Sequence, residues 1–184
     1  MNTYKAEGIV LRTINYGEAD KIVSIYTSKR GKVSCIAKGI RKLKSRKGGN
    51  LEMFNQVNFF ASKGRGLDII TEVECLDDFD EWRSDLKKVV SAYEISEMTD
   101  KLTVEENEHE GVYGILVSAF GELKEAKTED LDLMVERYGE ALLGILGFWP
   151  EARPFPKEFN VFQKIEEIIE KELKSKKFSK RVKG

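Results

Sequence analysis

Histidine, cysteine and proline are scarce in this sequence. Its 184 residues include one histidine, two cysteines and three prolines. With His109 alone, one chain can form neither a histidine-based metal cluster nor a Ser-His-Asp triad. Cys35 and Cys75 cannot supply a four-thiolate zinc site, and we do not expect a disulfide between them in a reducing cytoplasm. Both are interpreted as small buried apolar residues, and no cofactor is expected.

Long apolar runs and nucleotide-binding signatures are also missing. No apolar run approaches the roughly 20 residues that span a bilayer, and the start of the chain, MNTYKAEGIV, lacks the apolar core of a signal peptide. We therefore expect a cytoplasmic protein that does not contact membranes. No P-loop is present, no GxGxxG follows a strand, and the many carboxylates lie in runs typical of solvated faces. Nothing in the sequence predicts an enzyme.

Charge, by contrast, is abundant and unevenly distributed. Charged residues make up 34% of the sequence, although the formal net charge is −1. Residues 29–50 are strongly basic, whereas acidic residues dominate 72–85 and 105–110. Because the local field steers a ligand, the small net charge does not exclude a polyanionic partner. Like charges at this density repel one another unless a polyanion neutralises them, and phosphate backbone is the commonest polyanion.

The first part of the chain shows the two-residue period of β-strands. Within residues 32–38, Val33, Cys35 and Ala37 occupy one face, which predicts a strand with one wet side. Further strands are predicted at 4–15, 21–27, 51–61 and 67–75. Five short strands without a helix among them favour a closed antiparallel barrel, because closure removes exposed edges. The OB fold is the first candidate, and an SH3-like barrel is the alternative.

From about residue 79 the apolar period changes to 3.6 residues, as in amphipathic helices. Four helices are predicted, at about 83–102, 112–124, 128–147 and 159–173. All three prolines lie in the link at 148–156. The predicted fold class is therefore α+β. We expect a five-stranded OB-fold DNA-binding domain at 1–78 and a helical domain of about four helices at 79–184.

The candidate binding residues lie in the basic run and in the hairpin at 63–66. The run follows a predicted strand, where nucleic-acid-binding barrels place their loops. A solvated loop that serves only solubility is the alternative interpretation. Bases would stack on aromatic side chains, of which Tyr4, Tyr16, Tyr26, Phe54, Phe59 and Phe60 lie on or beside strands. The predicted DNA-binding residues are Lys29, Arg30, Lys32, Lys38, Arg41, Lys42, Lys44, Arg46, Lys47 and Arg65.

Several motifs occur along the chain in an order typical of one family. They are 7–11 (EGIVL), 16–20 (YGEAD), 27–32 (TSKRGK), 37–39 (AKG), 66–67 (GL), 71–72 (TE), 146–150 (LGFWP) and 172–175 (ELKS) with Phe178. Together they resemble the RecO recombination-mediator family, most densely within the first 76 residues. Many members carry a four-cysteine zinc module after the LGF-x-P motif. Residues 151–159, EARPFPKEF, contain no cysteine, so we expect a variant without that module and with a shortened helical domain.

The resemblance also implies a function and partners. It implies binding to single- and double-stranded DNA, annealing of complementary strands, and a nucleoid-associated location in the cytoplasm. It implies RecR as a partner in loading recombinase onto DNA that is coated by single-strand-binding protein. Two alternatives stay open. One is an adaptor that recognises the acidic tail of single-strand-binding protein, and the other is an RNA-binding OB module.

Overall fold

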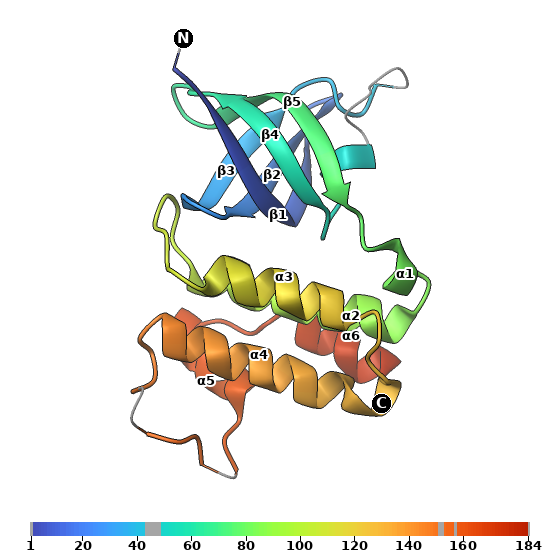
Figure 1. Ribbon diagram of the computed structural model, residues 1–184, viewed down its shortest axis with the longest axis vertical. Coiled ribbons are helices and arrows are strands. Elements are labelled where there is room, and N and C mark those ends of the chain that lie inside the picture. The colour runs from blue at the N-terminus through green and yellow to red at the C-terminus, as the bar shows by residue number, and fades with distance from the viewer. Residues whose placement is uncertain (1, 43–48, 151–152, 157, 184) are drawn as a thin grey trace. The chain divides into compact units, whose positions relative to one another are not determined.

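The computed structural model describes residues 2–42, 49–150, 153–156 and 158–183 and divides the chain into two compact units (Figure 1). The barrel unit comprises Met1–Asp78 and Thr103–Glu108, and the helical unit comprises Phe79–Leu102 and His109–Gly184. The segment Thr103–Glu108, which we expected in the helical domain, thus packs with the barrel. No helix in the described part of the chain combines the length and apolar character needed to cross a membrane.

Five strands close into a barrel. They are β1 (Thr3–Tyr16), β2 (Asp20–Thr27), β3 (Gly31–Ala37), β4 (Gln56–Ser62) and β5 (Asp68–Asp77). Their order around the barrel is β1-β2-β3-β5-β4, with β1 also paired to β4. Neighbouring strands are antiparallel except β3 and β5, which are parallel. This order and closure confirm the predicted five-stranded OB-fold barrel.

The apolar face of each strand fills the barrel interior. On β3, Val33, Cys35 and Ala37 are buried, as the alternation predicts. Burial raises the pKa of the Cys35 thiol to about 12, so this thiol stays protonated in the core. The prediction that Cys75 is buried is wrong, because this residue on β5 is only half-buried.

The fourth strand begins later than predicted. A strand was expected at 51–61, but β4 starts at Gln56 and follows a short 3₁₀ helix, η1 (Gly49–Leu51). Phe54 adopts a left-handed conformation with φ 76°, which interrupts an extended strand. Its backbone N–H donates to the Val10 carbonyl at 2.8 Å, and Phe54 is buried. The chain therefore turns into the core before it joins the sheet.

The described residues of the helical unit form six α-helices. They are α1 (Asp80–Arg83), α2 (Leu86–Leu102), α3 (Val112–Glu122), α4 (Leu131–Ile145), α5 (Val161–Ile169) and α6 (Ser175–Val182), with a 3₁₀ helix, η2 (Thr128–Asp130), before α4. The four predicted helices correspond to α2, α3, α4 and α5. The predicted helical domain is confirmed, with a single-turn helix and a basic C-terminal helix in addition.

The basic C-terminal helix α6 contacts α2 through polar groups at both of its ends. The backbone N–H groups of Lys174 and Ser175 donate to the Glu97 carboxylate at 3.0 and 2.7 Å, which favours a helix start because a negative charge stabilises the N-terminal end. At the other end, Lys183 Nζ donates to the buried Glu94 carboxylate at 2.8 Å. Burial raises the pKa of Glu94, and the Lys183 contact opposes that rise.

Candidate nucleic-acid interface

Five of the ten predicted cations form two groups at opposite ends of β3. Lys29 and Arg30 lie in the turn that precedes this strand, and Lys38, Arg41 and Lys42 follow its last residue. A strand of seven residues is roughly 20 Å long. The two groups therefore cannot contact the same phosphate. We call the second group, Lys38, Arg41 and Lys42, the arm base.

The backbone of the arm base is fixed against the turn between β1 and β2. The N–H of Gly39 donates to the Asp20 carboxylate at 2.7 Å. The N–H of Arg41 donates to the Ala19 carbonyl at 2.9 Å. Ile40, between them, is only 3% exposed and belongs to the barrel core. The charged side chains thus extend from a backbone that is anchored on both sides.

The side chains of the arm base remain accessible. Lys38, Arg41 and Lys42 are all exposed. The Arg41 guanidinium donates one hydrogen bond, to the Gly17 carbonyl at 3.3 Å. Within the described ranges, Lys38 and Lys42 form no ion pair. This surface can accept negative charge without first losing an internal carboxylate.

Tyr16 brings an aromatic ring to the same end of the barrel. It is the last residue of β1 and lies opposite Asp20, whose carboxylate holds Gly39. Tyr16 is 54% exposed. Among the six aromatic residues considered from the sequence, Tyr26, Phe54 and Phe59 are buried, Tyr4 is half-buried, and Phe60 is exposed on β4. Tyr16 is therefore the exposed aromatic residue of this set beside the arm base.

The other predicted binding residues have varied surroundings. Lys29 and Arg65 are exposed and form no ion pair with any described residue. Lys32 is largely buried, at 9% exposure. Lys44, Arg46 and Lys47 lie outside the described residues.

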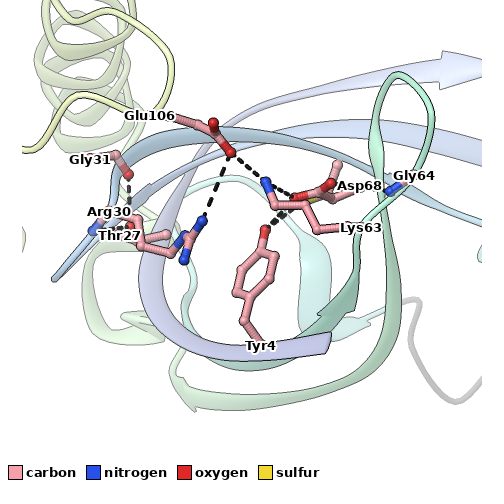
Figure 2. Close-up of polar contacts among 9 residues, drawn as sticks. Tyr4, Thr27, Arg30, Gly31, Lys63, Gly64, Asp68 and Glu106 are labelled. Carbon is pink, nitrogen blue, oxygen red and sulfur yellow. Dashed lines mark hydrogen bonds and ion pairs between the residues drawn. The ribbon is translucent and has the colours of Figure 1, made fainter. Parts of the chain in front are cut away.

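The turn before β3 faces the acidic segment Thr103–Glu108 of the same unit (Figure 2). A Glu106 carboxylate oxygen lies 3.9 Å from the Arg30 guanidinium and also pairs with Lys63. The backbone N–H of Glu106 donates to the Lys32 carbonyl at 2.8 Å. The Arg30 guanidinium is therefore paired with a carboxylate within the molecule, whereas the described residues show no ion pair for the cations of the arm base.

Tyr4 and Asp68 position the cations around Glu106. The Tyr4 hydroxyl donates to the Asp68 carboxylate at 2.8 Å, and Lys63 Nζ lies 3.1 Å from the same oxygen (Figure 2). The Arg30 guanidinium carbon lies 4.4 Å from the centre of the Tyr4 ring. Burial acts to raise the pKa of Asp68, but the hydrogen bonds from Tyr4 and Lys63 outweigh it and lower that pKa.

Sequence reasoning missed Tyr4, Lys63 and Asp68 as members of one cluster. They come from β1, from the turn between β4 and β5, and from β5, so only strand pairing brings them together. The basic hairpin at 63–66 was the one available signal, and it indicated Arg65 rather than Lys63.

Comparison with known proteins shows which proteins this chain is similar to. A family model described as "Recombination protein O N terminal" matches residues 1–79. The barrel is similar to the N-terminal part of RecO proteins. The predicted resemblance is thereby confirmed over all five strands of the barrel.

Several RecO relatives extend the match beyond the barrel. The protein named DNA repair protein RecO from Roseiflexus sp. is 35% identical over 148 residues, which cover 80% of this chain and 51% of the relative. The one from Rubrobacter xylanophilus is 52% identical over 92 residues, covering 50% and 37%. The one from Bifidobacterium adolescentis is 35% identical over 155 residues, covering 83% and 63%. The chain thus spans about half the length of the first of these RecO proteins, and less than two thirds of each.

Proposed function

We propose that the chain binds single- and double-stranded DNA through the arm base and Tyr16 and acts in DNA repair without catalysing a chemical step. The observation that carries this proposal is one exposed ring beside three exposed cations on an OB barrel that is similar to the N-terminal part of RecO proteins. A positive surface combined with an aromatic face holds single strands, because the cations contact phosphates while the ring stacks on a base. Duplex DNA uses the cations alone.

The same surface supports strand annealing. Lys38, Arg41 and Lys42 neutralise phosphates, and Lys44, Arg46 and Lys47 continue the positive charge along the sequence. Neutralisation lowers the repulsion between two strands and releases counterions, and base pairing supplies the free energy. No nucleophile or metal is required. Within repair, the proposal includes the partners that the family resemblance implies, RecR and the single-strand-binding protein on DNA awaiting recombinase.

The salt dependence of DNA binding tests this proposal. Each lost phosphate contact flattens the log–log slope of affinity against salt by about 0.7 for single strands. The triple substitution Lys38→Ala, Arg41→Ala and Lys42→Ala should therefore flatten the slope by about 2. A control with the same charge change on exposed residues of the helical unit, Lys101→Ala, Lys127→Ala and Lys171→Ala, should leave it unchanged. An unaltered slope in the arm-base variant would exclude the arm base as the binding element.

The RNA-binding alternative is separated by competition. DNA and RNA oligomers of one sequence differ at the 2′-hydroxyl, and a protein that reads this group prefers RNA. We expect the DNA oligomer to compete at least as well as the RNA oligomer. A clear preference for RNA would favour the RNA-binding OB module instead.

An adaptor function is the second candidate, and a pocket in the helical unit favours it. The pocket, of about 380 Å³, is lined among others by Arg137, Trp149, Arg153 and Phe155, with one carboxylate, Glu140. The Trp149 and Phe155 rings stack with centres 4.8 Å apart, and the Arg153 guanidinium lies 5.7 Å from the Trp149 ring centre. Aromatic walls beside two guanidinium groups suit a peptide that is both acidic and apolar, as the tail of single-strand-binding protein is expected to be.

A larger hollow between α3 and α4 suits such a peptide less well. It measures about 480 Å³, and its rim includes Glu122, Glu125 and Asp130, which repel an acidic ligand. Titration of a tail peptide without DNA should give binding heat that Arg137→Ala and Arg153→Ala weaken. Lys101→Ala should not weaken it. Absence of heat in the unaltered protein would count against the adaptor.

A further inference from the structure

The barrel unit carries a second cluster of cations, built from Arg30 and Lys63 around the Glu106 carboxylate (Figure 2). Lys63 is shared between Glu106 and Asp68, and the Arg30 guanidinium lies over the Tyr4 ring. These neighbours hold both cations in place. The cluster is therefore preorganised to bind an anionic group of about the size of a carboxylate or a phosphate oxygen pair.

Arg30 does not use its full hydrogen-bonding capacity in this arrangement. Its 3.9 Å separation from Glu106 is longer than a hydrogen bond. Its buried Nε–H has no hydrogen-bond partner in the described part of the protein. The N–H donors of a guanidinium match two oxygens of one phosphate. Glu106 is shared with Lys63, so it does not provide acceptors for all the donors of Arg30.

Glu106 is attached to the barrel by its backbone, whereas its side chain is 57% exposed. The backbone N–H bonds the Lys32 carbonyl, and the neighbouring Glu105 carboxylate accepts a hydrogen bond from the Ser34 hydroxyl at 2.6 Å. A cleft of about 480 Å³ lies beside this contact, lined among others by Lys63, by Gly64 and by the carboxylates of Asp68, Glu105 and Glu106. Rotation of the exposed Glu106 side chain can therefore expose Arg30 and Lys63 to a ligand without displacing the segment Thr103–Glu108.

We propose that Arg30 and Lys63 form a second phosphate-binding site for a nucleic-acid strand, and that Glu106 occupies this site in the free protein. A backbone phosphate displaces the carboxylate and fills the Arg30 fork. This inference rests on the proposed DNA-binding function and deepens it. Because Arg30 precedes β3 and the arm base follows it, Arg30 and the arm base take different phosphates of the bound nucleic acid.

The test compares two neighbouring glutamates of the same segment. Glu106→Gln keeps the side-chain size and removes the charge that occupies the site. Glu108→Gln makes the same charge change at an exposed residue for which no ion pair is found among the described residues. Measured with a thymidine oligomer at fixed salt, Glu106→Gln should bind about two- to fivefold tighter than the unaltered protein, the range expected for releasing an exposed ion pair. Glu108→Gln should change affinity by much less.

A second substitution assigns the gain to this site. Lys63→Ala combined with Glu106→Gln should remove the gain, and Lys101→Ala combined with Glu106→Gln should retain it. The inference is overturned if the two glutamine variants gain equally, or if the gain survives Lys63→Ala. A different result would show that the proposed function is wrong: the arm-base triple variant would keep the salt slope of the unaltered protein. The comparison of Glu106→Gln with Glu108→Gln tests the cluster separately from that slope.

Discussion

Replacing Tyr16 with alanine separates base stacking from charge neutralisation. Stacking of one base on an aromatic side chain contributes about 1–3 kcal/mol. Part of the Tyr16 ring already contacts the protein, because the residue is 54% exposed. We therefore expect the lower part of that range, about 1–2 kcal/mol, which corresponds to roughly 5- to 30-fold weaker binding of a single strand. The loss of an exposed strand-end side chain should change stability by only about 0.5 kcal/mol.

The assay is fluorescence anisotropy with a thymidine oligomer and with a duplex of equal length. Bases of a duplex are already stacked on one another, so Tyr16→Ala should weaken single-strand binding and leave duplex binding nearly unchanged. The salt slope should stay constant, since no phosphate contact is lost. Phe60→Ala is the matched control. Phe60 is 42% exposed, but it pairs with Lys5 on the β1–β4 ladder rather than with the arm base.

Two results would refute this reasoning. An equal loss for single strands and duplex would mean that the ring does not stack on a base. A larger loss for Phe60→Ala than for Tyr16→Ala would place the contact surface near the start of β1, beside β4.

Two further predictions concern stability. Gly31→Ala should destabilise the barrel unit by more than Gly17→Ala does. Both glycines have positive φ, and Gly17→Ala should lower the stability by about 1 kcal/mol for this reason alone. At Gly31 a Cβ would in addition collide with the backbone of Asn107. Equal losses in urea unfolding would show that the segment containing Asn107 does not pack there. For Glu94, burial raises the pKa above the reference value of 4.5, so its contribution to stability is present below about pH 4.5 and is lost as the pH rises through the folded-state pKa. Glu94→Gln should therefore reduce the fall in the urea midpoint between about pH 4 and pH 7, and an unchanged pH dependence would contradict a raised pKa.

The sequence predicted most of the fold because its periodicity is strong. The alternation of Val33, Cys35 and Ala37 identified a strand with one buried face, and the apolar stripes identified α2, α3, α4 and α5. The late start of β4 was not predictable, because the left-handed conformation of Phe54 leaves no signal in a residue that strands favour. The apolar period did not identify helix α6, because few apolar residues mark it and its ends contact α2 through Glu94 and Glu97, and only the family resemblance indicated a last helix there.

The candidate site was predictable only in part. Charge density alone identified the basic run, but it did not distinguish Arg30, which faces Glu106, from Lys38, which forms no ion pair with a described residue. That difference depends on where residues 103–108 pack, more than 70 positions along the chain from Arg30. Likewise, nothing in the sequence separated the exposed Tyr16 from the buried Tyr26.

The rate at which the protein anneals two complementary oligonucleotides tests most directly whether the arm base lowers the repulsion between strands. The unaltered protein should accelerate annealing at low salt. The Lys38→Ala, Arg41→Ala and Lys42→Ala variant should lose most of that acceleration, while the Lys101→Ala, Lys127→Ala and Lys171→Ala control keeps it. Equal acceleration by the two triple variants would contradict the role assigned to the arm base.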